Sequence, residues 1–307
     1  MKKGKYNIDK ELIPYTKIKV PLVPFIVVIF QKLMGFLYAF QKSDKHVNII
    51  KRKVSVNSKH KIKILIYEPK NNNNKLPCML FIHGGGFVFN SAPHHFKLAR
   101  KFAKELSIKV ILVNYRLAPK YKYPIPLFDC FNAYKWILSN KELNIDINKI
   151  IVAGDSAGGN LATSLCLMAN DSNIKIPYAQ MLFYPVLNKN MNTDSYKKYQ
   201  NTPLCNSKDM KWYFNMYIKN LAIDSYYLSP LSAKSLKNMP LTYIEVAEFD
   251  CLHDEGILYA NKLKNENVNV EFHEIKNSMH GYDIAINSSF MNKVNDIRFN
   301  YIKTILN

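Results

Sequence analysis

The sequence predicts an α/β protein built on a mostly parallel sheet with helices on both faces. Short, continuous apolar runs such as Cys78–Ile82 and Val110–Val113 alternate with segments of helical periodicity such as His94–Leu106. Strands that are buried on both faces read as continuous apolar runs, and parallel strands are joined by helical crossovers. The chain has 307 residues, 48% of them hydrophobic, which suffices for one large core.

The same alternation continues along the chain, with one interruption. Ile62, Ile64 and Ile66 alternate with polar residues and predict a half-exposed strand. Further strands are predicted at Ile150–Ala153, Ala179–Tyr184, Leu241–Val246 and Val268–Ile275, and further helices at Pro126–Leu138, Ala157–Met168, Asp254–Lys264 and Phe290–Ile305. Residues 187–228, rich in Asn, Lys, Tyr and Met, break the pattern and are interpreted as an inserted lid. We therefore expect cap helices at 1–44, a catalytic domain at 45–186 and 229–307, and a cap insertion at 187–228.

The formal net charge of +20 raises the question of an acidic partner. Of 43 basic residues only four are arginine, at positions 52, 100, 116 and 298. Base-reading proteins depend on the planar guanidinium fork, and here Lys is spread along the whole chain. We expect no nucleic-acid partner, and an anionic lipid surface is the better alternative.

The apolar stretch 20–40 bears on location. Its uninterrupted run, residues 20–30, is too short to span a membrane, and no cleavage site of small residues follows it. We favour amphipathic cap helices over a membrane anchor. The five cysteines are odd in number and lack metal-type spacing, which predicts free thiols in a reducing compartment. A cytoplasmic protein is expected, with membrane association through the N-terminal segment as the alternative.

Six of the ten glycines form two clusters, and the first cluster surrounds Ser156. Gly154-Asp155-Ser156-Ala157-Gly158 fits the G-x-S-x-G nucleophile elbow, between a predicted strand and a predicted helix. A sharp strand-to-helix turn holds the serine in a strained conformation, and the helix N-terminus directs N–H groups at a developing oxyanion. Ser156 is therefore the candidate nucleophile.

The second cluster is Gly84, Gly85 and Gly86, directly after His83. Such a loop exposes backbone N–H groups where a substrate carbonyl oxygen binds. It does not fit a dinucleotide fingerprint, which requires G-x-G-x-x-G and a later acidic residue. We expect an oxyanion hole formed by Gly85, Gly86 and Ala157, with Gly84 as spacer; the division among the three glycines stays open.

The order Ser, acid, His of this elbow class indicates the remaining catalytic residues. His280 lies in a loop beyond the last predicted strand, whereas His273 falls inside that strand. Among the acids after strand Leu241–Val246, Asp250 lies in the strand–helix loop. Asp254 and Glu255 fall in the first turn of a helix, where acidic residues are favoured by the helix dipole. His280 is the predicted base and Asp250 the predicted acid, ahead of Glu248, Asp254 and Glu255.

These motifs together resemble the hormone-sensitive-lipase family of α/β-hydrolases, in its bacterial acetyl esterase and carboxylesterase branch. The similarity runs from about residue 44 to the C-terminus and includes Tyr115–Pro119, Tyr184-Pro185, Phe249–Gly256 and His280–Tyr282. The resemblance implies an eight-stranded, mostly parallel sheet and a helical cap built from the N-terminal segment and the insertion. One departure is Cys251, where the family has proline after the acid, and it is expected to loosen the acid loop.

The predicted function is hydrolysis of small to medium acyl esters through an acyl-enzyme, with no metal or organic cofactor. Alternatives are a non-catalytic ligand receptor on the same fold, a peptidase, and a membrane-associated lipase or deacetylase. The oligomeric state is left open between monomer and homodimer. Acyl specificity depends on how cap aromatics fold over the site. The candidates for this role are Phe36, Trp212, Tyr213 and Phe214.

Overall fold

The computed structural model describes residues 6–19, 22–70, 74–220 and 222–307, and its centre is one eight-stranded sheet. The strand order is β1-β2-β4-β3-β5-β6-β7-β8; β1 and β2 are antiparallel to their neighbours, and the pairs from β4 to β8 are parallel. The strands are β1 (Val47–Ser55), β2 (Lys61–Pro69), β3 (Leu76–Ile82), β4 (Lys109–Asn114), β5 (Ile145–Asp155), β6 (Ala179–Phe183), β7 (Leu241–Phe249) and β8 (Val270–Met279). The predicted α/β fold with an eight-stranded, mostly parallel sheet is confirmed.

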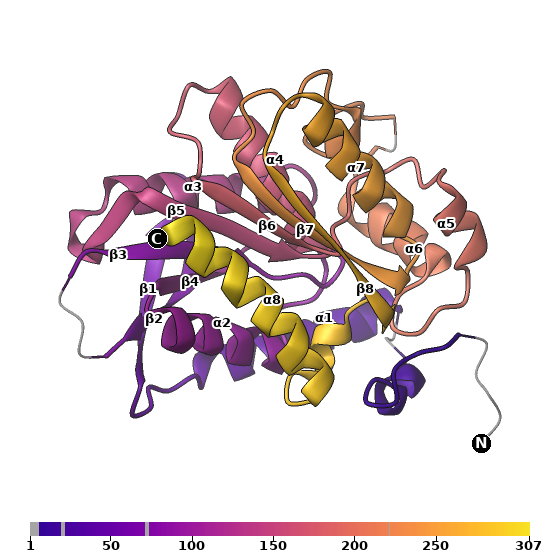
Figure 1. Ribbon diagram of the computed structural model, residues 1–307, viewed down its shortest axis with the longest axis horizontal. Coiled ribbons are helices and arrows are strands. Elements are labelled where there is room, and N and C mark those ends of the chain that lie inside the picture. Colours follow the sequence, from indigo (N-terminus) through magenta and orange to yellow (C-terminus); the bar gives the residue numbers. More distant parts are fainter. Residues whose placement is uncertain (1–5, 20–21, 71–73, 221) are drawn as a thin grey trace.

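Helices cover both faces of the sheet, with α2 and α8 on one face and α3, α4 and α7 on the other (Figure 1). The α-helices are α1 (Pro24–Ala39), α2 (Pro93–Leu106), α3 (Ile125–Ser139), α4 (Ala157–Asp171), α5 (Asp194–Lys198), α6 (Ser207–Tyr217), α7 (His253–Asn265) and α8 (Ser289–Leu306). Short 3-10 helices are η1 (Ile13–Lys17), η2 (Lys141–Leu143), η3 (Pro230–Ser232) and η4 (Tyr282–Ala285). Each layer of helices buries its apolar side chains against one face of the sheet, so the core lies in two clusters separated by the strands.

Strand β1 was not predicted from the hydrophobic pattern. Its central residues, Lys51, Arg52 and Lys53, are exposed, and only its ends are buried. Charged side chains at a sheet edge discourage pairing with another chain, which explains why an edge strand lacks an apolar run.

The parallel strands position the candidate catalytic residues because their carboxyl ends meet at one edge of the sheet. Strand β3 ends at Ile82, before the glycine loop, and β5 ends at Asp155, before Ser156. Strand β7 ends at Phe249, before Asp250, and β8 ends at Met279, before His280. Ligands of open α/β sheets bind at this edge.

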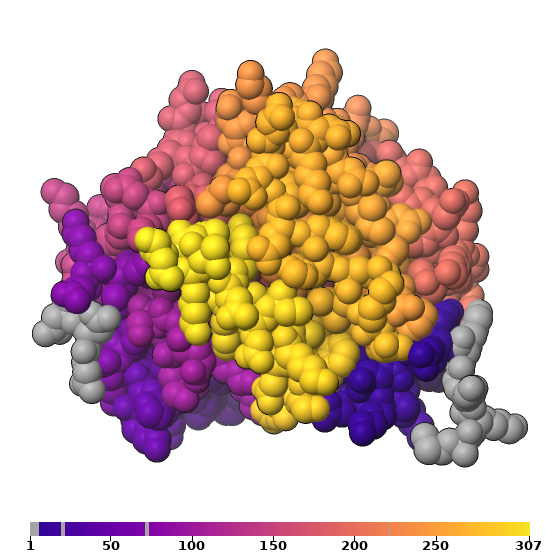
Figure 2. Space-filling view, viewed as in Figure 1, coloured from indigo at the N-terminus to yellow at the C-terminus, as the bar shows by residue number. Residues whose placement is uncertain are grey.

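The N-terminal segment and the inserted segment both pack onto this body. Figure 2 shows the N-terminal segment, in indigo, beside the C-terminal part of the chain. There Glu11 accepts hydrogen bonds from the Ser289 hydroxyl and the Phe290 amide, both at 2.7 Å. At the base of the insertion, the Asn160 side-chain amide donates to the carbonyl oxygens of Val186 and Leu228, at 3.0 and 3.2 Å. The division into a cap and a catalytic domain remains a prediction.

Most of the apolar stretch 20–40 forms helix α1, Pro24–Ala39; residues 20–21 lie outside the described part of the chain. Within the residues described, no helix combines the length and the apolar character needed to cross a membrane.

Candidate active site

Ser156 occupies a sharp turn between β5 and α4. Its backbone has φ +53° and ψ −119°, a strained conformation for a residue with a side chain. Hydrogen bonds hold it there, because the Ser156 amide donates to the Phe183 carbonyl at 2.8 Å and its carbonyl accepts from the Val186 amide at 3.0 Å. A Cβ on Gly158 would lie 2.7 Å from the His83 carbonyl oxygen and closer still to that of Ile82, so only glycine fits at this crossing of strand and helix.

The three predicted catalytic side chains form one chain of hydrogen bonds. His280 Nε2 lies 2.9 Å from Ser156 Oγ, and His280 Nδ1 lies 2.6 Å from Asp250 Oδ2. Asp250 is fully buried, and Ser156 and His280 are each 6% exposed. A carboxylate only accepts, so Nδ1 carries the proton donated to Asp250 and Nε2 is free to accept the serine hydroxyl proton.

Electrostatics favour a charged His280 in this position. Burial lowers the pKa of His280, but the raising effect of the Asp250 carboxylate outweighs it, so the pKa lies above the usual value of 6.5. An imidazolium formed when Ser156 gives up its proton is therefore stabilised by Asp250.

The three competing acids make other contacts. Asp254 Oδ2 accepts from the Ser195 amide at 2.7 Å, and Glu248 Oε2 accepts from the Asn277 amide at 2.7 Å. Glu255 accepts from the Leu187 amide at 2.6 Å, and burial raises its pKa well above the ordinary value. Cys251 does not leave the acid loop untethered, because its carbonyl accepts from the Ser195 hydroxyl at 2.7 Å.

The glycine loop lies beside Ser156, and its amides are not equivalent. Gly84 donates to Asp155 Oδ1 at 2.9 Å, so its amide is already engaged. Within the part of the chain that is described, the amides of Gly85, Gly86 and Ala157 have no protein acceptor. Gly85 and Gly86 line the same cavity as Ser156 and His280, and both have positive φ, +106° and +62°. The amides of Gly85 and Gly86 are available to a ligand oxygen in the cavity, and the Ala157 amide follows Ser156 at the N-terminus of α4.

A family model described as an α/β-hydrolase fold matches residues 79–284. The chain belongs to this family. A putative α/β hydrolase of Acanthamoeba polyphaga mimivirus is 35% identical over 75% of this chain and 67% of its own length, and the ethyl acetate hydrolase of Pseudomonas putida is 30% identical over 78% and 77%. The structure of a bacterial heroin esterase superposes with a TM-score of 0.88 at 28% identity, covering 98% of each chain. The predicted hormone-sensitive-lipase type of α/β hydrolase is confirmed.

Beneath the glycine loop, this α/β hydrolase has a buried support that the sequence did not reveal. His95 Nε2 lies 3.1 Å from Asp155 Oδ1, while His95 Nδ1 accepts from the Ala92 amide at 2.8 Å. Burial lowers the pKa of His83 to about 3, so this ring is neutral; its Nδ1 donates to the Gly84 carbonyl at 2.8 Å. The signal for these residues was present, since His83 and Asp155 belong to the two motifs, but the motifs do not say which partners they bind.

His94, His95 and Asp155 are also the one group of described residues whose donor atoms could hold a metal ion, all lying within 4.8 Å of one another. The Asp155 carboxylate already accepts from His95 and from the Gly84 amide. A metal ion bound here would have to replace these hydrogen bonds. We therefore interpret the group as a hydrogen-bonded support of the glycine loop.

A second buried network supports the histidine loop. Arg298 is fully buried and pairs with Glu245 and with Asp283, the latter at 2.7 Å. Asp283 in turn accepts from the Tyr184 hydroxyl at 2.6 Å, and the Tyr184 ring lies 4.9 Å from the His280 ring. This network could not be predicted from the sequence, because Tyr184, Glu245 and Arg298 are far apart in the chain.

The site opens into a cavity of about 310 Å³ with mostly apolar walls. Besides Ser156 and His280, its lining includes Phe30, Met34, Phe89, Leu204, Cys205, Met210, Tyr213 and Ile284. Of the four aromatic residues proposed to shape it, Tyr213 lines the cavity, Trp212 packs edge-on against Tyr213, and Phe214 lies near Phe87.

Phe36, the fourth candidate, does not line the cavity. It is 60% exposed and its ring lies tilted against that of Phe40, while Phe30 and Met34 are the residues of α1 that reach the cavity. Phe30 and Met34 are four residues apart and share a helix face, and Phe36 points elsewhere.

Proposed function

We propose that this protein is a serine carboxylester hydrolase with Ser156 as nucleophile, His280 as general base and Asp250 as the acid that orients it. The observation that carries the proposal is the buried chain Ser156 Oγ, His280, Asp250, with separations of 2.9 and 2.6 Å, at the wall of an apolar cavity. The relatives include enzymes named for ester hydrolysis, which supports the reaction class.

The first step forms an acyl-enzyme. Ser156 Oγ attacks the ester carbonyl carbon while His280 Nε2 takes the hydroxyl proton. The tetrahedral intermediate collapses as His280 gives that proton to the departing alcohol. Asp250 stabilises the imidazolium in between, without itself becoming protonated.

The negative charge on the carbonyl oxygen needs donors that are free before substrate arrives. We assign this role to the amides of Gly85, Gly86 and Ala157, with Gly84 as the spacer that holds the loop to Asp155. Losing one such donor typically lowers turnover by about 10²–10³.

Water completes the cycle. His280 takes a proton from water, which attacks the acyl carbon, and then returns the proton to Ser156 Oγ as the carboxylic acid leaves. Atoms balance as one ester and one water giving one acid and one alcohol.

The substrate we propose is a small to medium acyl ester. A cavity of about 310 Å³ lies at the low end of small-molecule sites, and Tyr213 closes over Gly86. The five described cysteines are free and buried, which supports the prediction of a cytoplasmic location.

The test is hydrolysis of a p-nitrophenyl ester series from C2 to C16 by the purified full-length protein, with matched anilides to detect peptidase-type activity. We expect a preference for short and medium esters, weak anilide cleavage, and loss of activity and of fluorophosphonate labelling in Ser156→Ala. Ser139→Ala, at the exposed end of α3, is the matched control. Undiminished hydrolysis by Ser156→Ala would overturn the proposal.

A further inference from the structure

Helix α1 presents an apolar surface to solvent. Nine of its apolar residues and the one that follows it are exposed, most of all Phe25 at 75%, Phe36 at 60% and Leu33 at 58%. We call this surface the α1 face; it consists of Phe25, Ile26, Val28, Ile29, Leu33, Phe36, Leu37, Ala39 and Phe40. Phe30 is also partly exposed, at 38%, but it lines the cavity and is not counted in the α1 face. Single exposed apolar residues are normal in proteins, but a contiguous apolar surface of this kind marks an interaction site.

The helix is fixed in this orientation by a narrow inward stripe, namely Val27, Gln31, Met34 and Tyr38. The Gln31 side-chain amide donates to the carbonyl oxygens of Val88 and Ala118, at 2.7 and 2.8 Å, and the Tyr38 hydroxyl donates to the Leu112 carbonyl at 3.2 Å. Through this stripe α1 meets the body, and most of its other apolar residues remain exposed.

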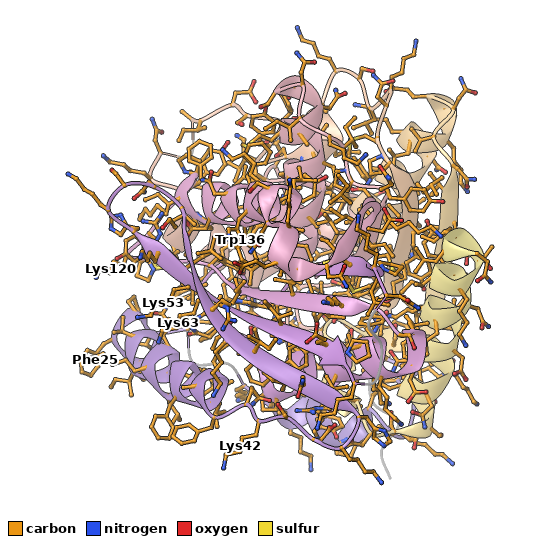
Figure 3. The ribbon with its side chains drawn as sticks, turned by 90° about the vertical axis from the view of Figure 1, so that its left-hand side faces the viewer. Phe25, Lys42, Lys53, Lys63, Lys120 and Trp136 are labelled. Atoms are coloured by element: carbon orange, nitrogen blue, oxygen red, sulfur yellow. The ribbon has the colours of Figure 1, made fainter. Side chains whose placement is uncertain are left out.

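The charges around the α1 face are almost all positive. Residues 12–67 contain ten Lys and Arg52 but one acidic residue, Asp44, which is paired with Arg100. Lys53 and Lys63 face each other across β1 and β2. Figure 3 shows Phe25 pointing away from the body on α1, with Lys53 and Lys63 on the neighbouring strands and Lys42 beyond the helix.

We propose that the α1 face docks onto an anionic lipid surface, with α1 lying in the plane of the membrane–water interface. A helix of 16 residues is about 24 Å long, shorter than the hydrocarbon core of a bilayer, so it lies along the membrane. Apolar residues then enter the boundary between headgroups and acyl chains, and the surrounding lysines bind lipid phosphates.

Charge argues for lipid over a second copy of the chain. In a symmetric dimer the same surface meets itself, so the basic surroundings of each α1 face would repel those of its partner. Asp44 is the one acidic residue that residues 12–67 could offer, and it already binds Arg100.

The docked helix is also a wall of the cavity, through Phe30 and Met34. Docking therefore brings the site next to acyl chains, and esters dissolved in lipid could enter along α1 without passing through water. This consequence rests on the proposed function, whereas lipid binding itself does not.

The experiment is co-sedimentation of the full-length protein with vesicles of phosphatidylcholine alone or with phosphatidylglycerol added. We expect binding to the anionic vesicles that weakens from 0.1 to 0.5 M salt, since screening lengths fall over this range. The triple variant Phe25→Ser, Ile29→Ser, Leu33→Ser, which spares every cavity-lining residue, should bind at least about tenfold more weakly. The double variant Lys53→Gln, Lys63→Gln should bind anionic vesicles roughly thirtyfold more weakly than the wild type.

Matched controls carry the same three apolar changes and the same two lysine changes elsewhere on the surface: Phe128→Ser with Ile147→Ser and Leu258→Ser, and Lys234→Gln with Lys264→Gln. They should bind as the wild type does, and all variants should hydrolyse soluble p-nitrophenyl acetate. Absence of binding to anionic vesicles, or equal binding by the triple variant, overturns the proposal. A wild-type dimer in sedimentation equilibrium that the triple variant dissociates, without vesicle binding, also overturns it in favour of self-association. Vesicle binding without ester hydrolysis would instead count against the proposed function alone.

Discussion

Gly84 donates its amide hydrogen to the Asp155 carboxylate at 2.9 Å, which joins the glycine loop to the residue before the nucleophile. A Cβ on Gly84 would lie 2.8 Å from the Asp155 carbonyl oxygen and closer still to the carboxylate. The next two residues of the loop, Gly85 and Gly86, line the cavity, and their amides donate no backbone hydrogen bond within the part of the chain that is described. Asp155 is thus a positioning residue for the proposed oxyanion hole.

Asp155→Asn should lower kcat by about 10² with little change in KM, because the uncharged amide accepts more weakly from Gly84 and His95, its NH2 group replaces the oxygen that lies 3.2 Å from His95 Nε2, and the loop shifts. Steady-state kinetics with a p-nitrophenyl ester measure this, and fluorophosphonate labelling of Ser156 should persist. The exposed Asp296→Asn serves as control. An unchanged kcat in Asp155→Asn would remove Asp155 from this role.

Asp250→Asn should lower kcat/KM by about 10⁴, because the amide no longer stabilises the imidazolium. It should also move the acid limb of the pH profile downward. The pKa of His280 is raised above 6.5, and His280 must be neutral to act as base. In the wild type, kcat/KM should therefore keep rising as the pH increases beyond 6.5. Without the carboxylate, burial lowers that pKa. His273→Gln on β8 is the control, and a profile unaffected by Asp250→Asn contradicts the assignment.

The same pair makes stability depend on pH. The folded pKa of His280 lies above the unfolded value of about 6.5. The pair therefore stabilises the fold fully below pH 6.5, and this contribution is lost as pH rises through the raised pKa. Urea unfolding at several pH values should show a smaller pH dependence above 6.5 in Asp250→Asn than in the wild type.

Arg298→Met should lower the free energy of unfolding by about 3–5 kcal/mol, because it leaves two buried carboxylates, Glu245 and Asp283, without their partner. Arg100→Met breaks a partly exposed pair with Asp44 and should cost about 0–1 kcal/mol. Urea unfolding of both variants makes the comparison. Equal losses would show that the buried network has no special weight.

Gly158→Ala should destabilise the protein by roughly 1–3 kcal/mol and impair hydrolysis, because its Cβ overlaps the Ile82 and His83 backbone. Gly35→Ala is the matched opposite case. Nothing lies within 4 Å of a Cβ there, and alanine in a helix is favoured over glycine by about 0.5–1 kcal/mol. The unfolding midpoint should fall in Gly158→Ala and rise in Gly35→Ala, and the initial rate of hydrolysis should fall in Gly158→Ala. A Gly158→Ala variant with unchanged stability and activity would contradict the proposed close approach.

The fold and the relay from Ser156 to Asp250 could be predicted because each depends on local patterns. Buried parallel strands appear as apolar runs, and the turn that holds Ser156 requires glycines next to it in the chain. The order Ser, acid, His then limited the search for Asp250 and His280 to the part of the chain that follows the strand predicted at Leu241–Val246. Edge strand β1 could not be predicted from apolar runs, because its central residues are exposed and charged.

Contacts between distant segments could not be predicted in the same way. Arg298 meets Glu245 and Asp283 because α8 crosses the sheet, and nothing near Arg298 in the sequence indicates this. Likewise, α1 is apolar on nearly every side, so periodicity could not tell that Phe30 faces the site and Phe36 faces solvent.

Phe89 stands between the two segments that roof the cavity. Its ring meets Phe30 of α1 edge-on at 5.8 Å and Tyr213 of α6 edge-on at 6.2 Å. Phe89 follows the glycine loop, so both α1 and α6 pack against a residue that belongs to the loop beside Ser156. We expect that replacing one of these two segments leaves the contact between Phe89 and the other segment in place. We therefore expect that grafting either segment from a relative would change acyl specificity while Ser156, His280 and Asp250 keep their positions.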